Sequence, residues 1–144
     1  FRLAKLGLAI MPPPGRLSAI HVDDLVRLLL ALAAAPADQM LYEADGPDGG
    51  FTHRDYFAAI GAAVGRAPLP LPLPTGLLKL ASRADRLMRR DRAKLTPDRV
   101  AYMVHPDWVA DPAKAPPAAL WQPRIALREG MADAARWYRA QGLL

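Results

Sequence analysis

One apolar segment constrains the fold of this chain more than any other. Residues 25–32 are apolar at every position except Arg27. Asp23 and Asp24 come directly before them and predict the start of a helix, because a carboxylate there accepts hydrogen bonds from free backbone N–H groups and meets the positive end of the helix dipole. A helix with one charge in three turns has almost no polar face. We therefore expect it to be buried on most of its circumference.

Two strand candidates flank this helix. Residues 17–22 precede it, and residues 40–44 follow Pro36, which ends it; the turn residues 45–50 come next. Strand, helix and strand in roughly 30 residues form one right-handed crossover unit, which predicts a parallel sheet. Two strands do not make a stable sheet by themselves. The sequence therefore predicts that further strands come from outside these residues.

The chain beyond residue 50 begins with a predicted helix, which an extended segment follows. Thr52 and Asp55 resemble a capping box, and Gly65 suits the end of the helix that they open. Residues 67–74 carry a proline at every second position, so half of their backbone N–H groups are missing and a central strand is excluded. We expect an extended connector that its leucines lay across the core. The helix that Thr52 and Asp55 open has Tyr56, Phe57, Ile60 and Val64 on its inward face.

Three further helices are predicted in the rest of the chain. Thr96 followed by Pro97 predicts a short helix, and residues 127–140 form the last one, with Met131, Ala134, Ala135 and Tyr138 inward. The fold class is α/β, mostly helical with a few strands. Residues 1–50 are read as a strand–helix–strand portion of a larger sheet, and residues 51–144 as a mainly helical portion. The third of these helices lies within residues 76–94 and is amphipathic, with an apolar stripe formed by Leu77, Leu80, Ala81, Ala84, Leu87 and Met88.

Basic residues are concentrated on this amphipathic helix. The formal net charge of the chain is +5, and residues 83–94 hold Arg83, Arg86, Arg89, Arg90, Arg92 and Lys94. We interpret them as a solvated face opposite the leucine stripe. The alternative is a stand-alone interaction module that binds an acidic partner through residues 76–94. Nucleic acid is disfavoured as a partner, because no aromatic side chains are interleaved with these charges for base stacking.

No complete active site is visible in the sequence. The chain has no cysteine, which excludes disulfides and thiolate metal sites. Its three histidines fall on separate predicted elements without paired ligand spacing, so no metal site is predicted. The glycines of the turn at 45–50 have the wrong spacing for a dinucleotide-binding loop, and no tyrosine has a lysine four residues later. We therefore assign no catalytic, cofactor-binding or metal-ligating residues.

The order of these segments nevertheless resembles one family. Residues 18–25 (SAIHVDDL) resemble a segment of the extended short-chain dehydrogenases, the NAD-dependent epimerase/dehydratase group. A tyrosine-containing strand, Asp45-Gly46, a Thr-capped helix and a leucine–proline segment follow in the family's order. The closing residues 120–123 (LWQP), 127–130 (LREG) and 137–143 (WYRAQGL) echo the end of the family's pattern. The resemblance covers nearly the whole chain.

The resemblance implies the C-terminal, substrate-side part of a Rossmann-like enzyme. Such an enzyme transfers hydride with NAD or NADP and acts on a small organic or sugar-like molecule by epimerisation, dehydration or reduction. In the family, the nucleotide-binding glycines and the Tyr-x-x-x-Lys pair precede the matching region. We therefore expect this chain to be catalytically incomplete alone and to bind no nicotinamide cofactor. Its expected partners are the missing N-terminal half or a second copy of the chain. By position, the substrate-pocket candidates are Arg16, Ser18 and His21.

The sequence also bears on location. The most apolar stretch, residues 25–35, is about half of the roughly 20 residues that span a bilayer, and it contains Arg27. The first residues lack the long apolar run and small-residue cleavage site of a signal peptide. We therefore expect a cytoplasmic protein without a membrane partner.

Overall fold

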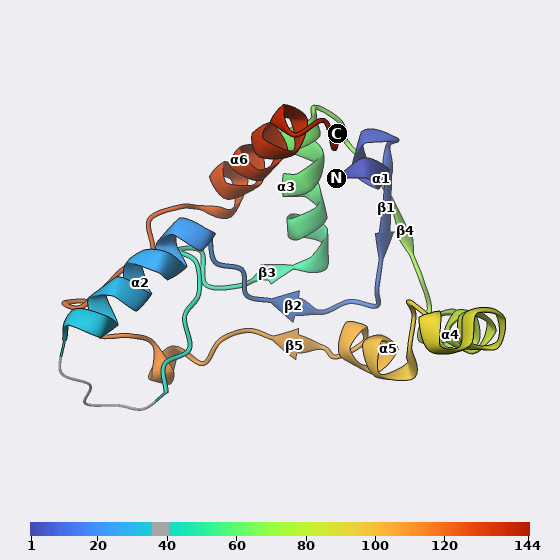
Figure 1. The fold of residues 1–144 in the computed structure, drawn as a ribbon, viewed down its shortest axis with the longest axis horizontal. Helices are drawn as coiled ribbons and strands as arrows, with labels where there is room; N and C mark the ends of the chain where they lie inside the picture. The colour runs from blue at the N-terminus through green and yellow to red at the C-terminus, as the bar shows by residue number, and fades with distance from the viewer. Residues whose placement is uncertain (36–40) are drawn as a thin grey trace.

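The computed structural model describes residues 1–35 and 41–144 and is a small mixed α/β domain, as the sequence predicts at that level (Figure 1). Its helices are α1 (Arg2–Lys5), α2 (Val22–Ala34), α3 (His53–Val64), α4 (Thr75–Arg89), α5 (Pro97–Met103) and α6 (Leu127–Ala140), with the 3-10 turns η1 (Arg90–Arg92) and η2 (Pro112–Lys114). Its strands are β1 (Leu8–Met11), β2 (Arg16–Leu17), β3 (Phe51–Thr52), β4 (Leu69–Pro72) and β5 (Asp107–Trp108).

The predicted strand–helix–strand crossover is wrong for the described residues. The strand expected at 17–22 shrinks to β2, which pairs antiparallel with β3 and parallel with β5. Residues 41–44 of the second expected strand are not in a strand, and Met40 lies outside the described residues. The reason is local, because the Asp45 carboxylate takes hydrogen bonds from the Ser18 hydroxyl (2.5 Å) and the Ala19 N–H (3.2 Å). These bonds replace the ladder that a longer strand would make.

A second, smaller sheet joins β1 and β4 in parallel. Helix α1 ends at Lys5, and Gly7 then adopts φ +84° and leads the chain into β1. The N–H of Leu69 donates to Gly7 O (2.8 Å) and that of Leu73 donates to Met11 O (2.9 Å). Pro70 and Pro72, which lie between them, have no N–H to donate, and among the described strands β4 pairs with β1 alone, which fits the exclusion of a central strand. Leu69 and Leu71 are exposed, so the prediction that the leucines cover the core is wrong.

Helix α2 differs most from its prediction. Its N-cap is His21, whose Nδ1 accepts the Asp23 N–H at 3.3 Å, so neither aspartate is the cap. The prediction that it is buried nearly all round is also wrong. Leu28 is 3% exposed, but Leu29 is 56% and Leu30 is 65% exposed. One face of α2 therefore packs inside the domain, and a broad apolar face does not.

The centre of the domain is the packing of α3 against α6 and α1. The predicted capping box is confirmed, because Thr52 and Asp55 exchange bonds across the first turn of α3 and Gly65 ends the helix at φ +75°. Ile60 of α3 and Ala135 of α6 lie in the core. The small side chains on both helices allow their backbones to approach closely.

Helix α4 is present as predicted, but its apolar stripe faces outward. Leu78 and Ser82 are buried, whereas Leu87 is 82% exposed and Leu77, Leu80 and Met88 are also exposed. The Asp85 carboxylate accepts the backbone N–H groups of Lys94 and Leu95, each at 2.7 Å. This turn leads the chain into α5, which packs against α4, and the stripe stays uncovered. The start of α5, with Thr96 as its cap and Pro97 in its first turn, is confirmed.

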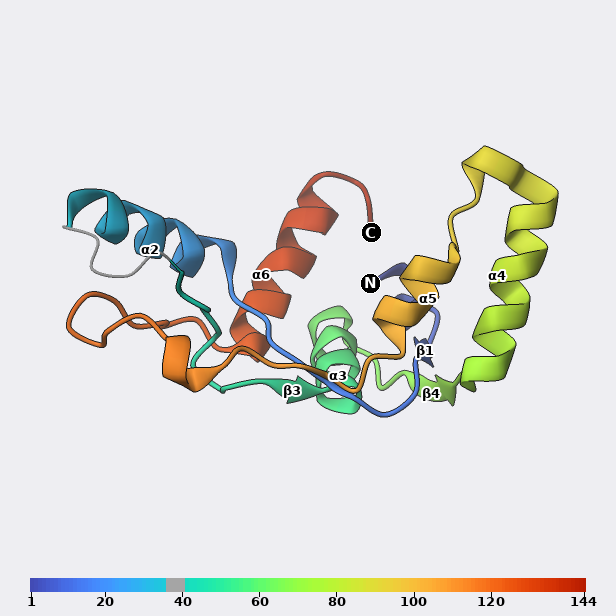
Figure 2. The same cartoon turned by 90° about the horizontal axis from the view of Figure 1, so that it is seen from below.

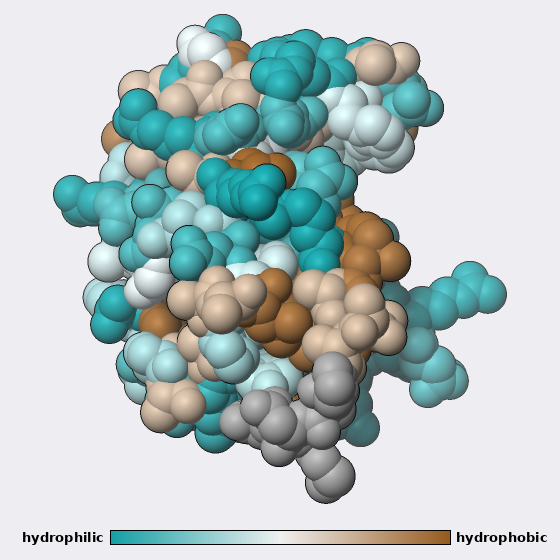
Figure 3. Space-filling view, turned by 90° about the vertical axis from the view of Figure 1, so that its left-hand side faces the viewer, coloured by the Kyte–Doolittle hydropathy of each residue, from teal (hydrophilic) through white to brown (hydrophobic). Residues whose placement is uncertain are grey.

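Three helices lie on one side of the strands. In Figure 2, α2, α6 and α4 extend above the level of β3 and β4, with α2 and α4 at opposite ends of the view, whereas α3 lies at the level of β3. Figure 3 looks at the end of the molecule that holds α2 and shows apolar surface along the right-hand edge of that view. In the described part of the chain, no helix is both long enough and apolar enough to cross a bilayer.

Candidate functional site

A cleft of about 570 Å³ lies between α6, the chain at residues 19–23 and Tyr56 of α3. Small-molecule sites in proteins have volumes of roughly 300–1,000 Å³ and combine apolar walls with a few polar groups. This cleft has that composition. Its walls include Ile20, Ile125, Leu127, Met131 and Trp137, and its side chains with polar atoms are those of His21, Asp23, Tyr56, Asp133 and Tyr138.

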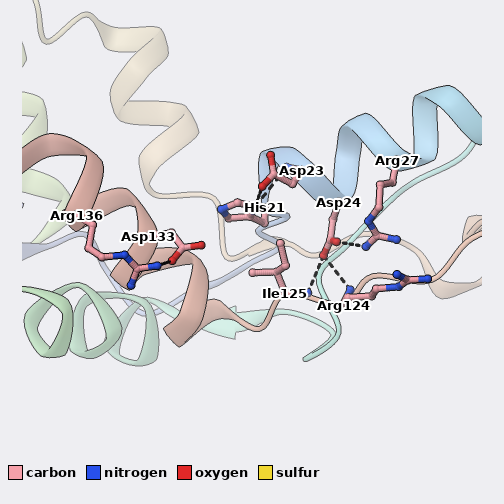
Figure 4. Close-up of polar contacts among 8 residues, drawn as sticks. All are labelled: His21, Asp23, Asp24, Arg27, Arg124, Ile125, Asp133 and Arg136. Carbon is pink, nitrogen blue, oxygen red and sulfur yellow. Dashed lines mark hydrogen bonds and ion pairs between the residues drawn. The ribbon is translucent and has the colours of Figure 1, made fainter. Parts of the chain in front are cut away.

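Two contacts hold the His21 side chain at the N-terminus of α2. Its Nδ1 lies 3.3 Å from the Asp23 backbone nitrogen and 3.7 Å from the Asp23 carboxylate. We take the shorter contact as the bond, because it completes the N-cap; Nδ1 is then an acceptor, and the neutral ring carries its proton on Nε2. The ring also lies against Gly130, where a Cβ would be 3.0 Å from His21 Cδ2. Figure 4 shows the ring reaching from the start of α2 toward α6.

Asp24 fixes the wall of the cleft from behind. It is fully buried and accepts the backbone N–H groups of Arg124 and Ile125, both at 2.9 Å, together with the Arg27 guanidinium (Figure 4). Its backbone carbonyl accepts the Trp121 indole N–H at 3.0 Å. Burial alone would raise the pKa of Asp24, but the N–H groups of Ile125 and Arg124 and the bond from Arg27 outweigh it and lower the pKa. Asp24 thereby anchors Ile125, a cleft residue, to α2.

Tyr56 and Asp133 are two further polar groups of the cleft. Burial raises the pKa of the Tyr56 phenol, so this hydroxyl stays protonated at neutral pH. The Asp133 carboxylate is bonded by Arg136 one turn further along α6. None of the described residues that line the cleft is a lysine or an arginine. The cleft can therefore offer hydrogen bonds, but it offers no free positive charge.

One of the three predicted site residues lies in the cleft. His21 lines it, whereas Arg16 and Ser18 do not. The Ser18 hydroxyl donates to Asp45 and accepts the Ala110 N–H at 2.9 Å, so it joins three segments of the fold. Arg16 is exposed in β2, between Thr52 of β3 and Asp107 of β5.

Sequence reasoning missed Tyr56 and Asp133 as site residues. Tyr56 was assigned to the inward face of α3, where it lies half-buried, and its helical spacing could not distinguish a core residue from a cleft residue. Asp133 had no distinguishing signal. It belongs to the site only because α6 packs on α3, a contact between segments far apart in the sequence.

The other two histidines lie elsewhere. His53 Nδ1 is 3.0 Å from Pro13 O, and the His105 ring packs against Trp108 with ring centres 4.4 Å apart and planes tilted by 37°. In residues 1–35 and 41–144, no group of three or more His, Asp or Glu side chains could hold a metal ion.

Two comparisons with known proteins found no match. No protein-family model matches the chain, and no curated protein matches it. The resemblance to the extended short-chain dehydrogenases therefore rests on the order of the sequence motifs.

Proposed function

We propose that this chain is the substrate-binding C-terminal portion of an NAD(P)-dependent epimerase, dehydratase or reductase of the extended short-chain dehydrogenase family. The observation that carries the proposal is the uncovered face of α2, formed by Val22, Leu25, Val26, Leu29 and Leu30. Contiguous exposed apolar surface of this kind marks a contact with another part of a protein. In the proposed enzyme, a Rossmann-like sheet that the preceding segment supplies covers this face.

The residues of this chain do not fit a nicotinamide dinucleotide. That cofactor needs a strand, a glycine-rich turn and a helix whose N-terminus meets the pyrophosphate. The strands that precede α2 and α3 lead into them through His21 and Thr52, without such a turn. Tyr42, Tyr56, Tyr102 and Tyr138 are followed four residues later by Gly, Ile, Pro and Gly. We assign cofactor binding and proton transfer to the segment that would precede residue 1, and substrate binding to the cleft at His21.

Cofactor titration tests this division of labour. We expect the 144-residue chain to give no saturable heat with NADH or NADPH in calorimetry, whereas a protein extended by its upstream coding sequence binds one of them with micromolar affinity. The reason is that the phosphate-binding turn lies upstream. Micromolar binding by the 144-residue chain, or an upstream sequence without a strand–glycine-loop–helix and Tyr-x-x-x-Lys, would count against the proposal.

A substitution at Leu29 tests the uncovered face. Leu29 is 56% exposed, so Leu29→Asp should change the stability of the 144-residue chain by no more than about 0.5 kcal/mol. In the extended protein the same change would bury an unpaired carboxylate, and we expect a loss of about 2 kcal/mol or more. Urea unfolding of both forms measures the difference. Equal effects in the two forms would show that nothing upstream covers α2.

A second function is favoured by the surface of α4. The exposed leucines of this helix lie beside exposed Arg83, Arg86, Arg89, Arg90, Arg92 and Lys94. A helix with an apolar stripe flanked by cations suits an acidic protein partner with its own apolar groove. This interaction-module function becomes the preferred one if the upstream sequence lacks the nucleotide-binding elements.

A further inference from the structure

We propose that the cleft at His21 binds a neutral, largely apolar carbonyl compound and discriminates against phosphorylated or carboxylated ligands. The inference deepens the proposed function and rests on it, because it names the class of molecule that the proposed substrate-binding portion would hold. Charge, hydrogen bonding and wall composition each support it.

The charge of the cleft opposes an anion. Asp23 and Asp133 both line it, and none of its described lining residues is a lysine or an arginine. The Arg136 guanidinium, one turn along α6 from Asp133, is bonded to the Asp133 carboxylate. Phosphate and carboxylate recognition relies on arginine, lysine or a free set of backbone N–H groups. Two helix N-termini line the cleft. The Asp23 N–H at the start of α2 is capped by His21, and the Leu127 N–H at the start of α6 donates to the Asp48 carboxylate at 3.2 Å, which brings a further negative charge to that end of the cleft.

The hydrogen-bond donor of the cleft is Nε2 of His21. Because Nδ1 accepts the cap bond, the neutral ring has its N–H at Nε2. Among the described residues, none accepts a hydrogen bond from this atom. Gly130 allows the ring to lie flush against α6, since any larger residue there would meet His21 Cδ2. A ring that is held in this way presents one fixed donor, which suits a ligand with one accepting oxygen.

The remaining walls suit an apolar body. Ile20 and Ile125 lie on the α2 side, and Met131, Trp137 and Tyr138 lie along α6. Thioether and aromatic side chains make favourable contacts with flat rings and alkyl groups. A carbonyl compound with an aryl or alkyl body would place its oxygen at His21 and its carbon frame against these walls.

The test uses three matched probes on the 144-residue chain. Acetophenone has the carbonyl oxygen, ethylbenzene lacks it, and benzoate carries a negative charge; dissociation constants come from NMR shift titrations of cleft resonances. The critical variant is His21→Asn, because asparagine is among the best N-caps and should keep α2 intact while removing the Nε2 donor. His105→Asn is the matched control, because His105 packs against Trp108 and does not line the cleft.

We expect the affinity ratio of acetophenone to ethylbenzene to fall about fivefold in His21→Asn and to stay unchanged in His105→Asn, as the loss of one neutral hydrogen bond predicts. Benzoate should bind at least about tenfold more weakly than acetophenone, because no cation offsets its desolvation. The inference is overturned if benzoate binds as well as acetophenone, if the ratio survives in His21→Asn, or if no probe shifts cleft resonances. None of these titrations involves a nicotinamide, so their failure is separate from a failure of the cofactor experiment.

Discussion

Replacing Asp24 by alanine should lower the free energy of unfolding of this domain far more than replacing its neighbour Asp23. The carboxylate is fully buried and satisfies the N–H groups of Arg124 and Ile125 and the guanidinium of Arg27. Asp24→Ala leaves all of these donors unpaired, two of them on the chain that forms the cleft wall. Breaking a buried charged network in this way costs about 3–5 kcal/mol. Urea unfolding followed by tryptophan fluorescence measures it, since Trp121 donates to the carbonyl of Asp24 itself.

Asp23→Ala is the matched control. The Asp23 side chain is 73% exposed, and only its backbone N–H takes part in the α2 cap. We expect a change within about 0.5 kcal/mol, as for other exposed positions. A similar loss of stability in the two variants would mean that the Asp24 network is not formed in solution.

The same network gives stability a pH dependence with a defined sign. Because folding lowers the pKa of Asp24 below its ordinary value of 3.8, the folded state holds this carboxylate ionised more strongly than the unfolded chain does. Its contribution is therefore fully present above that ordinary value and is lost as the pH falls through the lowered pKa of the folded state. Asp24→Ala should remove this part of the acid sensitivity.

Local signals in the sequence predicted the helices well. The capping box of Thr52 and Asp55 and the left-handed Gly65 act within a few residues, so pattern alone locates α3. The pairing of β1 with β4 was missed, because each strand is short and its partner is distant in the chain. The sequence also could not predict which face of α4 is buried. It depends on Asp85 binding the N–H groups of Lys94 and Leu95, which the helical period does not encode.

The candidate site was predicted only where a motif pointed to it. His21 belongs to the stretch that resembles the dehydrogenase family, and it does line the cleft. Ser18 lies on the same stretch, but Asp45 and Ala110 use its hydroxyl. Asp24 was read as a cap, because an aspartate in a first helical turn usually is one. Its role depends on a loop that lies about a hundred residues later in the sequence, a kind of contact that local patterns cannot predict.

Gly61→Ala should destabilise the domain although alanine is the better helix former. In a helix interior this exchange normally stabilises by about 1 kcal/mol. Here Gly61 lies where the chain turns back after Gly65, and a Cβ would be 2.3 Å from Pro68 Cδ and 2.6 Å from Arg66 O. The Arg66 N–H also donates to Gly61 O at 2.9 Å, so the turn cannot move away without losing that bond. We expect a net loss of about 1–3 kcal/mol, as for other overpacked positions.

Gly76→Ala provides the opposite result in the same experiment. Gly76 lies in the first turn of α4, and nothing stands within 4 Å of the Cβ that alanine would add. Without a clash, the helix preference of alanine acts alone, and we expect a gain of up to about 1 kcal/mol in the free energy of unfolding. Opposite signs for the two substitutions would establish that the segment of Arg66 and Pro68 packs directly on α3. A gain in both would mean that this segment, and β4 after it, lies elsewhere in solution.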